Sequence, residues 1–301
     1  MGSENHEENR FASFRKKHQS QIKDFKLTLH LLRKNPLSIL GILLVAGFTV
    51  AAVLAPWIAP QDPKAIDLMN RLQPPSWAHL AGTDSAGRDI LSMIIYGSQY
   101  DLQIAIIVAL ASGTIGSIVG VYSGFLGGKI DEILMRITDV FYSIPSLILA
   151  LAVAAALGER GIRTLVLAIS VAWWPGYARL VRAEAMRIRE LEYVLAAKAM
   201  GASNWRIMFR HVLPNAISVI IVRATLDMGY IILTAASLSF VGFGAQPQEP
   251  EWGRMISDGR LYVGTAWWSA TFPGIAIMLT VLAFNLLGDG LRDALDPKIR
   301  R

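Results

Sequence analysis

The sequence of 301 residues has no cysteine and little charge, since Asp, Glu, Lys and Arg together make up 17% of it. The absence of cysteine excludes a disulfide framework and cysteine-ligated metal sites. Soluble domains carry about 25% charged residues, so this chain is too apolar to be one. Hydrophobic residues reach 53% and the mean hydropathy is +0.42. The composition therefore predicts an integral membrane protein.

Motifs for catalysis and nucleotide binding are also missing. The five histidines lie outside the predicted membrane spans, which removes the histidine of an intramembrane serine or zinc protease. No GxxxxGK[ST] sequence occurs, so the chain has no Walker loop for ATP. We therefore expect no enzyme activity, no cofactor and no metal site in this chain. The basic residues lie beside apolar runs, so a membrane explains the pI of about 9.6 better than nucleic acid does.

Six apolar segments predict an all-α membrane protein with six transmembrane helices, because about 20 residues cross a bilayer. Pro145 predicts a kink in the third segment. The fourth segment has only 15 residues, so it spans the bilayer only if Arg179 and Arg182 snorkel to the interface. Residues 60–101 are expected to form a polar outer loop, and residues 129–136 a short charged turn. The six segments are residues 37–59, 102–125, 140–157, 164–178, 212–241 and 268–288.

Lys and Arg are distributed unevenly around these segments. With the N-terminus inside, 21 of them lie in inner segments and 7 in outer loops. The positive-inside bias then places both termini and the loop 179–211 in the cytoplasm. The predicted organisation is a cytoplasmic tail at 1–35, a first helix and outer loop at 36–101, a core of five helices at 102–290 and a cytoplasmic tail at 291–301. Helical spacing of apolar residues in the first tail predicts either an amphipathic surface helix or a partly disordered segment.

Glycines recur at every fourth position in the second segment, at Gly116, Gly120 and Gly124. Such a face of small residues allows two helices to approach closely. We interpret it as a packing surface and not as a site of chemistry.

The inner loop from Tyr193 to Asn215 is predicted to form two short helices that are broken at Gly201. Helix-forming residues precede this glycine, and Ser203 offers a cap to the second helix. Pro214 is expected in the first turn of the next apolar helix. Taken alone, this pattern also fits an ordinary amphipathic connector.

The spacing of Ala196-Ala197, Gly201 and Leu213-Pro214 resembles the EAA loop of ABC importer permeases. Leu195 stands where that pattern has Glu and His211 where it has Ile, departures that resemble the dipeptide/oligopeptide branch. Four other strings resemble the same branch, so the likeness extends over roughly residues 36–301. They are GTDSAGRD at 82–89, MRITDVFYSIPSLILALA at 135–152, FVGFGAQPQEPEWGRMISDGR at 240–260 and LLGDGLRDALDPKIRR at 286–301.

The resemblance implies a type I ABC importer permease of the dipeptide/oligopeptide/nickel family, in the inner or plasma membrane of a prokaryote. It further implies a heterodimer with a second, homologous permease, two cytoplasmic ATPase subunits that carry ATP and Mg, and an external solute-binding protein. Members carry di- or oligopeptides, nickel chelates, glutathione or oligosaccharides. The ATPase-coupling residues would be Ala196, Ala197, Lys198, Met200, Gly201, Ala202, Leu213 and Pro214. Contacts to the binding protein would come from Gly82, Thr83, Asp84, Gly87, Arg88, Asp89, Glu251 and Trp252.

Two ionisable residues, Arg223 and Asp227, lie inside the fifth segment and four residues apart, hence on one helical face. A lone charge at mid-membrane costs roughly 2.5–3.5 kcal/mol by insertion scales, so the pair should face protein or water. Two interpretations remain open: a structural ion pair, or a lining of the solute path in which Arg223 meets a carboxylate and Asp227 an amine. Charged residues in a span argue against an inert membrane scaffold. A stand-alone secondary transporter would need repeats and an ion-coupling site that the sequence does not display.

Overall fold

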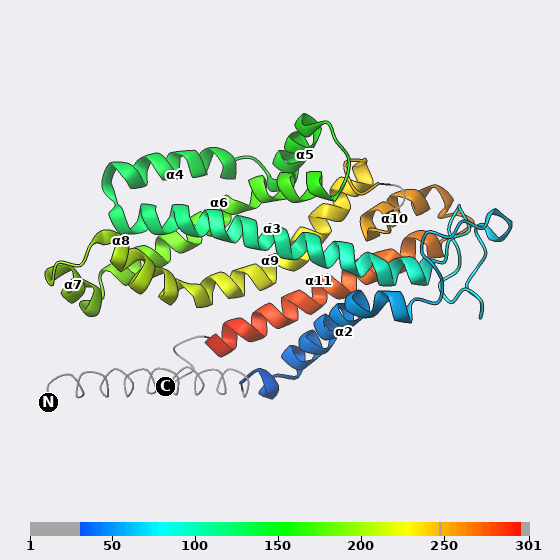
Figure 1. The fold of residues 1–301 in the computed structure, drawn as a ribbon, viewed down its shortest axis with the longest axis horizontal. Helices are drawn as coiled ribbons and strands as arrows, with labels where there is room; N and C mark the ends of the chain where they lie inside the picture. The colour runs from blue at the N-terminus through cyan, green and yellow to red at the C-terminus, as the bar shows by residue number, and fades with distance from the viewer. Residues whose placement is uncertain (1–30, 247–248, 296–301) are drawn as a thin grey trace, which may run out of the picture.

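The computed structural model describes residues 31–246 and 249–295, so most of the helix predicted within 1–35 lies outside the described residues. The molecule is an elongated bundle whose long helices run along its length (Figure 1). The loop between the first two long helices lies at one end of the bundle. The segment that contains Gly201 lies at the opposite end. We refer to these as the outer end and the inner end.

Five long apolar helices can each cross a membrane: α2 (Pro36–Ile58), α3 (Ile90–Leu126), α6 (Ile162–Arg189), α9 (Leu213–Val241) and α11 (Trp268–Leu295). The bent pair of α4 (Gly128–Tyr142) and α5 (Ser146–Leu157), counted as one broken span, gives the sixth crossing. The described residues contain no strand, only one isolated bridge between Thr83 and Asp89. The prediction of an all-α protein with six transmembrane helices is confirmed.

The third span is broken and not merely kinked, because α4 and α5 meet at an angle of 89°. The break lies at residues 143–145, where Pro145 cannot donate a backbone hydrogen bond. The predicted charged turn at 129–136 is wrong, since these residues belong to α4. Ile130, Ile133 and Ile137 repeat at helical spacing between the charges, a pattern that marks an amphipathic helix.

The second helix begins at Ile90, so the predicted outer loop ends at residue 89 and not at 101. Asp89 is the reason, because its carboxylate accepts the backbone N–H of Ser92 at 2.8 Å and caps the helix. The glycine face predicted on this helix is confirmed as a packing surface against α6. A Cβ added to Gly116, Gly120 or Gly124 would lie 2.4–2.5 Å from atoms of α6.

The fourth helix is longer than its apolar segment and continues through the basic residues to Arg189. Two of these residues pair with carboxylates of α4. Arg182 donates Nε and an Nη to both oxygens of Asp131, each at 2.6 Å, and Arg179 donates to Asp139 at 2.7 Å. Arg179 and Arg182 are therefore accommodated in the helix by ion pairs with α4. The sequence had instead suggested that their side chains snorkel to the membrane interface.

The fifth long helix starts before Pro214. The short helix α8 (Asn204–Ile207) runs through a π-helical turn, η2 (Met208–Val212), into α9. Leu213 and Pro214 form the first turn of α9, as predicted, and the candidate span that contains α9 continues toward the inner end as far as Asn204. The wide turn directly precedes the proline, whose missing N–H and ring disturb regular α-helical bonding.

The outer end carries further short helices that the sequence analysis treated as loops. They are η1 (Leu68–Asn70), α10 (Trp252–Gly259) and η3 (Arg260–Tyr262). A large apolar core joins α10 to the long helices, with Trp252 fully buried in it. A second, smaller core lies at the inner end among α3, α6 and the segment around α8.

Candidate functional site

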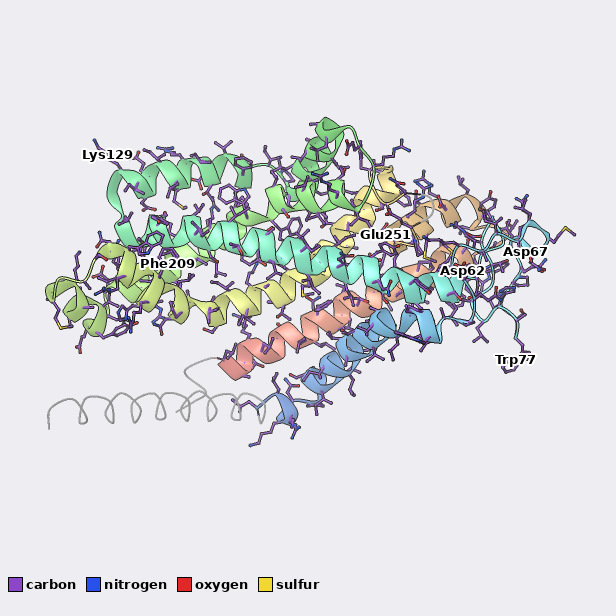
Figure 2. All side chains as sticks on the ribbon, viewed as in Figure 1. Asp62, Asp67, Trp77, Lys129, Phe209 and Glu251 are labelled. Carbon is purple, nitrogen blue, oxygen red and sulfur yellow. The ribbon has the colours of Figure 1, made fainter. Side chains whose placement is uncertain are left out.

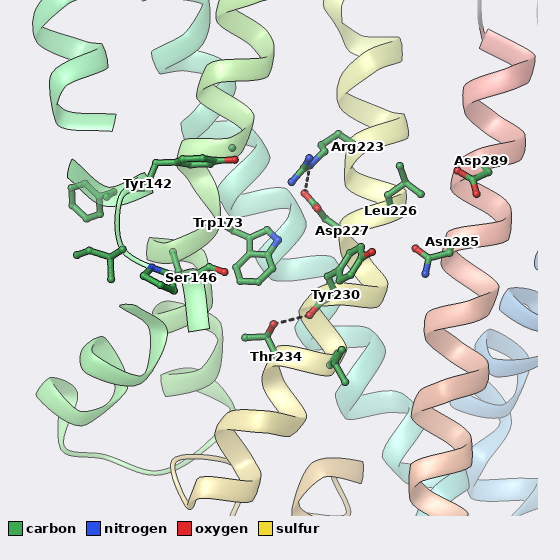
Figure 3. A pocket seen from close by; sticks show the side chains of 16 residues that line it. Tyr142, Ser146, Trp173, Arg223, Leu226, Asp227, Tyr230, Thr234, Asn285 and Asp289 are labelled. Atoms are coloured by element: carbon green, nitrogen blue, oxygen red, sulfur yellow. Dashed lines mark hydrogen bonds and ion pairs between the residues drawn. The ribbon is translucent and has the colours of Figure 1, made fainter. Parts of the chain in front are cut away.

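A pocket of about 810 Å³ opens between the α4–α5 break, α6, α9 and α11 (Figure 3). Its lining combines charged, amide, hydroxyl and aromatic side chains in the middle of an otherwise apolar bundle. Arg223 and Asp227, which the sequence analysis singled out, both line it. Polar or aromatic side chains that the sequence did not single out are Tyr142, Ser146, Trp173, Tyr230, Thr234, Asn285 and Asp289.

The two charged residues of α9 form an ion pair but differ in exposure. Arg223 donates Nε to Asp227 Oδ2 at 2.9 Å. The Asp227 side chain is 5% exposed, whereas that of Arg223 is 47% exposed. Asp227 therefore neutralises the guanidinium and fixes its orientation through Nε. The terminal nitrogens of Arg223 remain available to the pocket.

The opposite wall of the pocket is the break between α4 and α5. Tyr142, the last residue of α4, lies under the guanidinium of Arg179 at 4.0 Å from the ring centroid. Arg179 also pairs with Asp139 one turn earlier. The end of α4 is thus fixed to α6 through one arginine, which positions the aromatic side of the pocket.

At the inner end, α7 (Glu192–Ala199) presents the predicted coupling segment. The helix ends at Ala199 and is soon followed by Gly201, whose φ of +82° is left-handed, and the N–H of Ala202 donates to the carbonyl of Ala197 at 3.1 Å. Ser203 then caps α8. The predicted pair of short helices broken at a glycine is confirmed, although α8 is continuous with α9.

Only one side of this segment is anchored to the bundle. Ala197 is buried, Val194 belongs to the small inner core, and Ala202 and Leu213 are half-buried. The remaining predicted coupling residues are exposed, and Met200 is 82% exposed. They are Ala196, Lys198, Met200, Gly201 and Pro214. The coupling segment therefore offers a small, partly apolar surface on a fixed base.

Aromatic stacking supplies part of that base. Trp205 and Phe209 have ring centroids 4.2 Å apart, and both rings contact Tyr122 of α3 at 6.3 and 6.5 Å. Figure 2 shows Phe209 at the inner end of the bundle, beside α3. The segment around α8 is thus held against α3 by aromatic packing.

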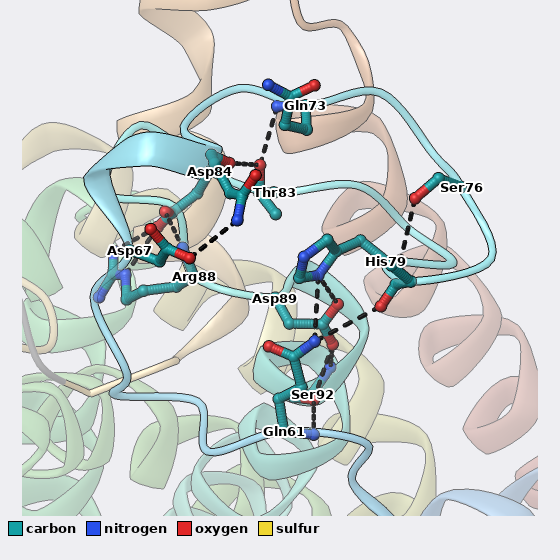
Figure 4. Close-up of polar contacts among 12 residues, drawn as sticks. Gln61, Asp67, Gln73, Ser76, His79, Thr83, Asp84, Arg88, Asp89 and Ser92 are labelled. Carbon is teal, nitrogen blue, oxygen red and sulfur yellow. Dashed lines mark hydrogen bonds and ion pairs between the residues drawn. The ribbon is translucent and has the colours of Figure 1, made fainter.

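The outer loop is a polar network, as Figure 4 shows. Asp84 accepts backbone N–H groups from Ala86 and Arg88 and pairs with the Arg88 guanidinium at 2.6 Å. Asp89 accepts from Ser92 and contacts His79 Nδ1 at 3.0 Å. A hydrogen bond from Asn70 lowers the pKa of the Asp67 carboxyl in the same loop.

Several residues predicted to contact a binding protein are enclosed within this chain. The side chains of Thr83, Asp89, Glu251 and Trp252 are buried, and Gly82 and Gly87 are buried as well. Asp84 and Arg88 are half-buried. The buried residues support the fold of the outer end. A binding protein can therefore contact only the exposed residues beside them.

Glu251 and Trp252 join α10 to α3. Glu251 caps α10 by accepting the N–H groups of Gly253 and Arg254 at 2.9 and 2.8 Å. Trp252 donates its backbone N–H to Asp101 at 3.1 Å and its indole N–H to the carbonyl of Ile94 at 3.0 Å. Burial raises the pKa of the Glu251 carboxyl, since the charged form loses water there.

Within residues 31–246 and 249–295, no three His, Asp or Glu side chains are grouped so that they could hold a metal ion. The side chains that line the pocket offer charge, hydrogen bonding and aromatic contact.

The bundle resembles the inward-facing MetNI methionine ABC transporter in fold. One chain of that structure matches with a TM-score of 0.56 and 21% identity, over 68% of this chain and 97% of the other. Sequence relatives are closer. The probable D,D-dipeptide transport system permease protein DdpC of Escherichia coli (strain K12) is 45% identical over 95% of this chain and 96% of its own length.

Two other relatives differ in the solute that they are named for. The dipeptide transport system permease protein DppC of Alkalihalophilus pseudofirmus is 44% identical, over 89% of this chain and 88% of its own. The glutathione transport system permease protein GsiD of Pectobacterium atrosepticum is 45% identical over 83% of each chain.

Two family models match separate parts of the chain. Residues 24–75 match the N-terminal transmembrane domain of oligopeptide transport permease C. Residues 116–301, which include the pocket, the coupling segment and α10, match the inner membrane component of binding-protein-dependent transport systems. This chain is a membrane-embedded permease that belongs to the family of binding-protein-dependent transport system inner membrane components.

Proposed function

We propose that this chain forms half of the path by which an ATP-driven importer moves di- or oligopeptides across the inner membrane of a prokaryote. The pocket of about 810 Å³, with the Arg223 guanidinium turned into it, carries the proposal. A guanidinium matches the geometry of a carboxylate, which every free peptide carries at its C-terminus. The names of the relatives from Escherichia coli and Alkalihalophilus pseudofirmus support the same solute class.

The proposed path is completed by a second, homologous permease. Tyr142, Tyr230 and Arg223 line the pocket and remain exposed in this chain alone. A charged group open to lipid is costly, so another protein surface is expected to cover this side. An apolar groove of about 640 Å³ between α5, α9, α10 and α11 offers further area for the same contact.

The energy source is expected to lie outside this chain, on two ATPase subunits that hold ATP and Mg. They would dock on α7 and Gly201 in the cytoplasm, where the positive-inside bias also places both termini. A solute-binding protein would deliver the solute to the outer end. Its contacts are expected around the predicted strings at 82–89 and 251–252, whose buried members set the shape of the exposed loop.

Glutathione is a second candidate solute, because the relative from Pectobacterium atrosepticum is named for it and is 45% identical to this chain. It has free carboxylates and an ammonium, so the same Arg223 surface would serve. Competition between unlabelled glutathione and a labelled dipeptide for uptake separates the two.

Reconstitution in proteoliposomes tests the proposal. The chain, its partner permease, the ATPases and the binding protein should together give uptake of a labelled dipeptide that requires ATP. Uptake without the ATPases, driven by an ion gradient, would instead establish a stand-alone secondary transporter.

The role of the ion pair is tested by removing both charges. Arg223→Gln alone leaves Asp227 buried and unpaired, which costs about 3–5 kcal/mol in buried pairs. The double variant Arg223→Gln/Asp227→Asn removes that penalty, so we expect assembly and basal ATPase activity to recover while dipeptide uptake stays low. Full uptake by the double variant would contradict a role of Arg223 in solute binding and establish a purely structural pair.

A further inference from the structure

The fourth wall of the pocket, α11, contributes two polar residues that the ion pair of α9 leaves unexplained. Asn285 and Asp289 are four residues apart, hence on one face of the helix, and both line the pocket. Asp289 is exposed. Asp289 directly follows the last apolar segment, residues 268–288, and its carboxylate opens into the pocket.

Tight packing fixes Asp289 relative to Arg223. A Cβ on Gly288 would lie 2.4 Å from Leu226 Cδ2, so α9 and α11 are in close contact beside the pocket. Figure 3 shows Leu226 between Arg223 and Asp289, with the two charged groups at similar depth. At ~1.5 Å per residue, Arg223 lies ~15 Å from the start of α9 and Asp289 ~9 Å from the end of α11, so both residues lie in the inner halves of their helices.

The two carboxylates of the pocket differ in what they are free to do. Asp227 is buried and already accepts from Arg223. Asp289 makes no ion pair with any residue in the described part of the chain. In the pocket, the guanidinium of Arg223 is neutralised by Asp227, whereas the carboxylate of Asp289 has no ion-pair partner among the described residues. Its lining has a net negative charge.

We infer that Asp289 binds the ammonium group of a zwitterionic solute whose carboxylate binds Arg223. Asn285, one turn away, offers an amide to the polar groups between the two charged ends. Asp227 is then a positioning residue for Arg223, and the amine-binding role that the sequence analysis gave to Asp227 passes to Asp289. The inference rests on the proposed peptide function and names the residue that selects for a free amino group.

The first test compares Asp289→Asn with Asp293→Asn in the reconstituted complex. Asp293 is an exposed aspartate one turn further along α11 that does not line the pocket. We expect Asp289→Asn to lower the uptake rate of labelled alanyl-alanine about tenfold, equivalent to ~1.4 kcal/mol. Basal ATPase activity should stay within about twofold for both variants, and Asp293→Asn should transport like the wild type.

A second measurement restores a negative charge at position 289 by chemical modification of a cysteine. In this chain the reagent can modify only that cysteine, because the chain has no native one. Asp289→Cys should transport poorly, and modification by the anionic reagent sulfonatoethyl methanethiosulfonate should restore uptake. The cationic reagent trimethylammonioethyl methanethiosulfonate should not. Wild-type chain and Asp293→Cys, treated in the same way, control for reaction elsewhere in the complex.

Unchanged uptake by Asp289→Asn, or equal effects of the two reagents, would overturn the inference. Loss of basal ATPase activity or of assembly in Asp289→Asn would also overturn it, because Asp289 would then serve coupling or folding. Absence of dipeptide uptake by the wild-type complex is a separate result, which contradicts the proposed function itself.

Discussion

The two ends of the bundle are built in opposite ways. At the outer end, polar groups are buried and bonded within the chain: Glu251 caps α10, Trp252 binds Asp101, and Asp89 joins Ser92 and His79. At the inner end, a small apolar core carries a segment whose other side is exposed. Satisfied buried polar networks make a structure rigid and specify one arrangement. The outer end is therefore held by bonds within this chain, whereas the inner end leaves one side of α7 exposed.

The largest effect is expected at Gly201. A Cβ at this position would have no atom of the described residues within 4 Å, so we expect added bulk to be felt mainly by a docked partner. We expect Gly201→Asp to insert into the membrane normally and to abolish ATP-driven uptake, through a clash at the docking surface and a disturbed left-handed turn. Membrane content and uptake are measured on the same vesicles.

The control for Gly201 is Gly128→Asp. Gly128 also has a positive φ, of +56°, and an open surrounding, and it lies at the α3–α4 junction outside the coupling segment. It should retain uptake. Equal loss in both variants would show that backbone strain, and not docking, is responsible.

The next effect concerns the rigidity of the outer end. Trp252→Ala empties a fully buried site and removes the indole bond to Ile94, so we expect a loss of about 3–5 kcal/mol in unfolding free energy. Trp77, which is 97% exposed and projects from the outer loop in Figure 2, should tolerate alanine within about 0.5 kcal/mol. Thermal unfolding in detergent compares them, and similar melting temperatures would contradict a rigid outer end.

The smallest effect is a pH dependence at the same end. Burial raises the pKa of Glu251 above its value of about 4.3 in an unfolded chain. Its protonated form is therefore favoured by folding, so this contribution to stability is present below about pH 4.3 and is lost as the pH rises through the folded pKa. Glu251→Gln should flatten the fall of melting temperature with rising pH. An unchanged slope would show that the pKa of Glu251 does not differ between the folded and unfolded states.

Much of the fold was accessible from the sequence, because long apolar runs and the glycine spacing at Gly116–Gly120–Gly124 depend on local chemistry alone. Helix ends were less accessible. Asp89 and Glu251 each cap a helix, but a single acidic residue in a polar loop does not distinguish a cap from a surface contact. The charged segment in α4 was misassigned because its carboxylates are paired with Arg179 and Arg182, some 40–50 residues away.

The candidate site was predicted only in part. Arg223 and Asp227 were found because charge within an apolar run stands out in the sequence. Asp289 lies near the end of the last apolar run, where a charge is ordinary, and it joins the pocket only because Gly288 packs on Leu226. The packing of α6, α9 and α11 around one pocket is tertiary structure, and the spacing of residues along the chain does not predict it.

The central claim, that the exposed inner segment is a docking surface for an ATPase subunit, is tested most directly by thiol labelling of single cysteines in this cysteine-free chain. Met200→Cys, at a position 82% exposed, is compared with Ser85→Cys in the outer loop. We predict that purified ATPase subunits protect residue 200 from a membrane-impermeant maleimide and leave residue 85 unaffected. In intact cells, we expect only residue 85 to be labelled from outside. Labelling of residue 200 that is unchanged by the ATPase, or that occurs from outside, would contradict it.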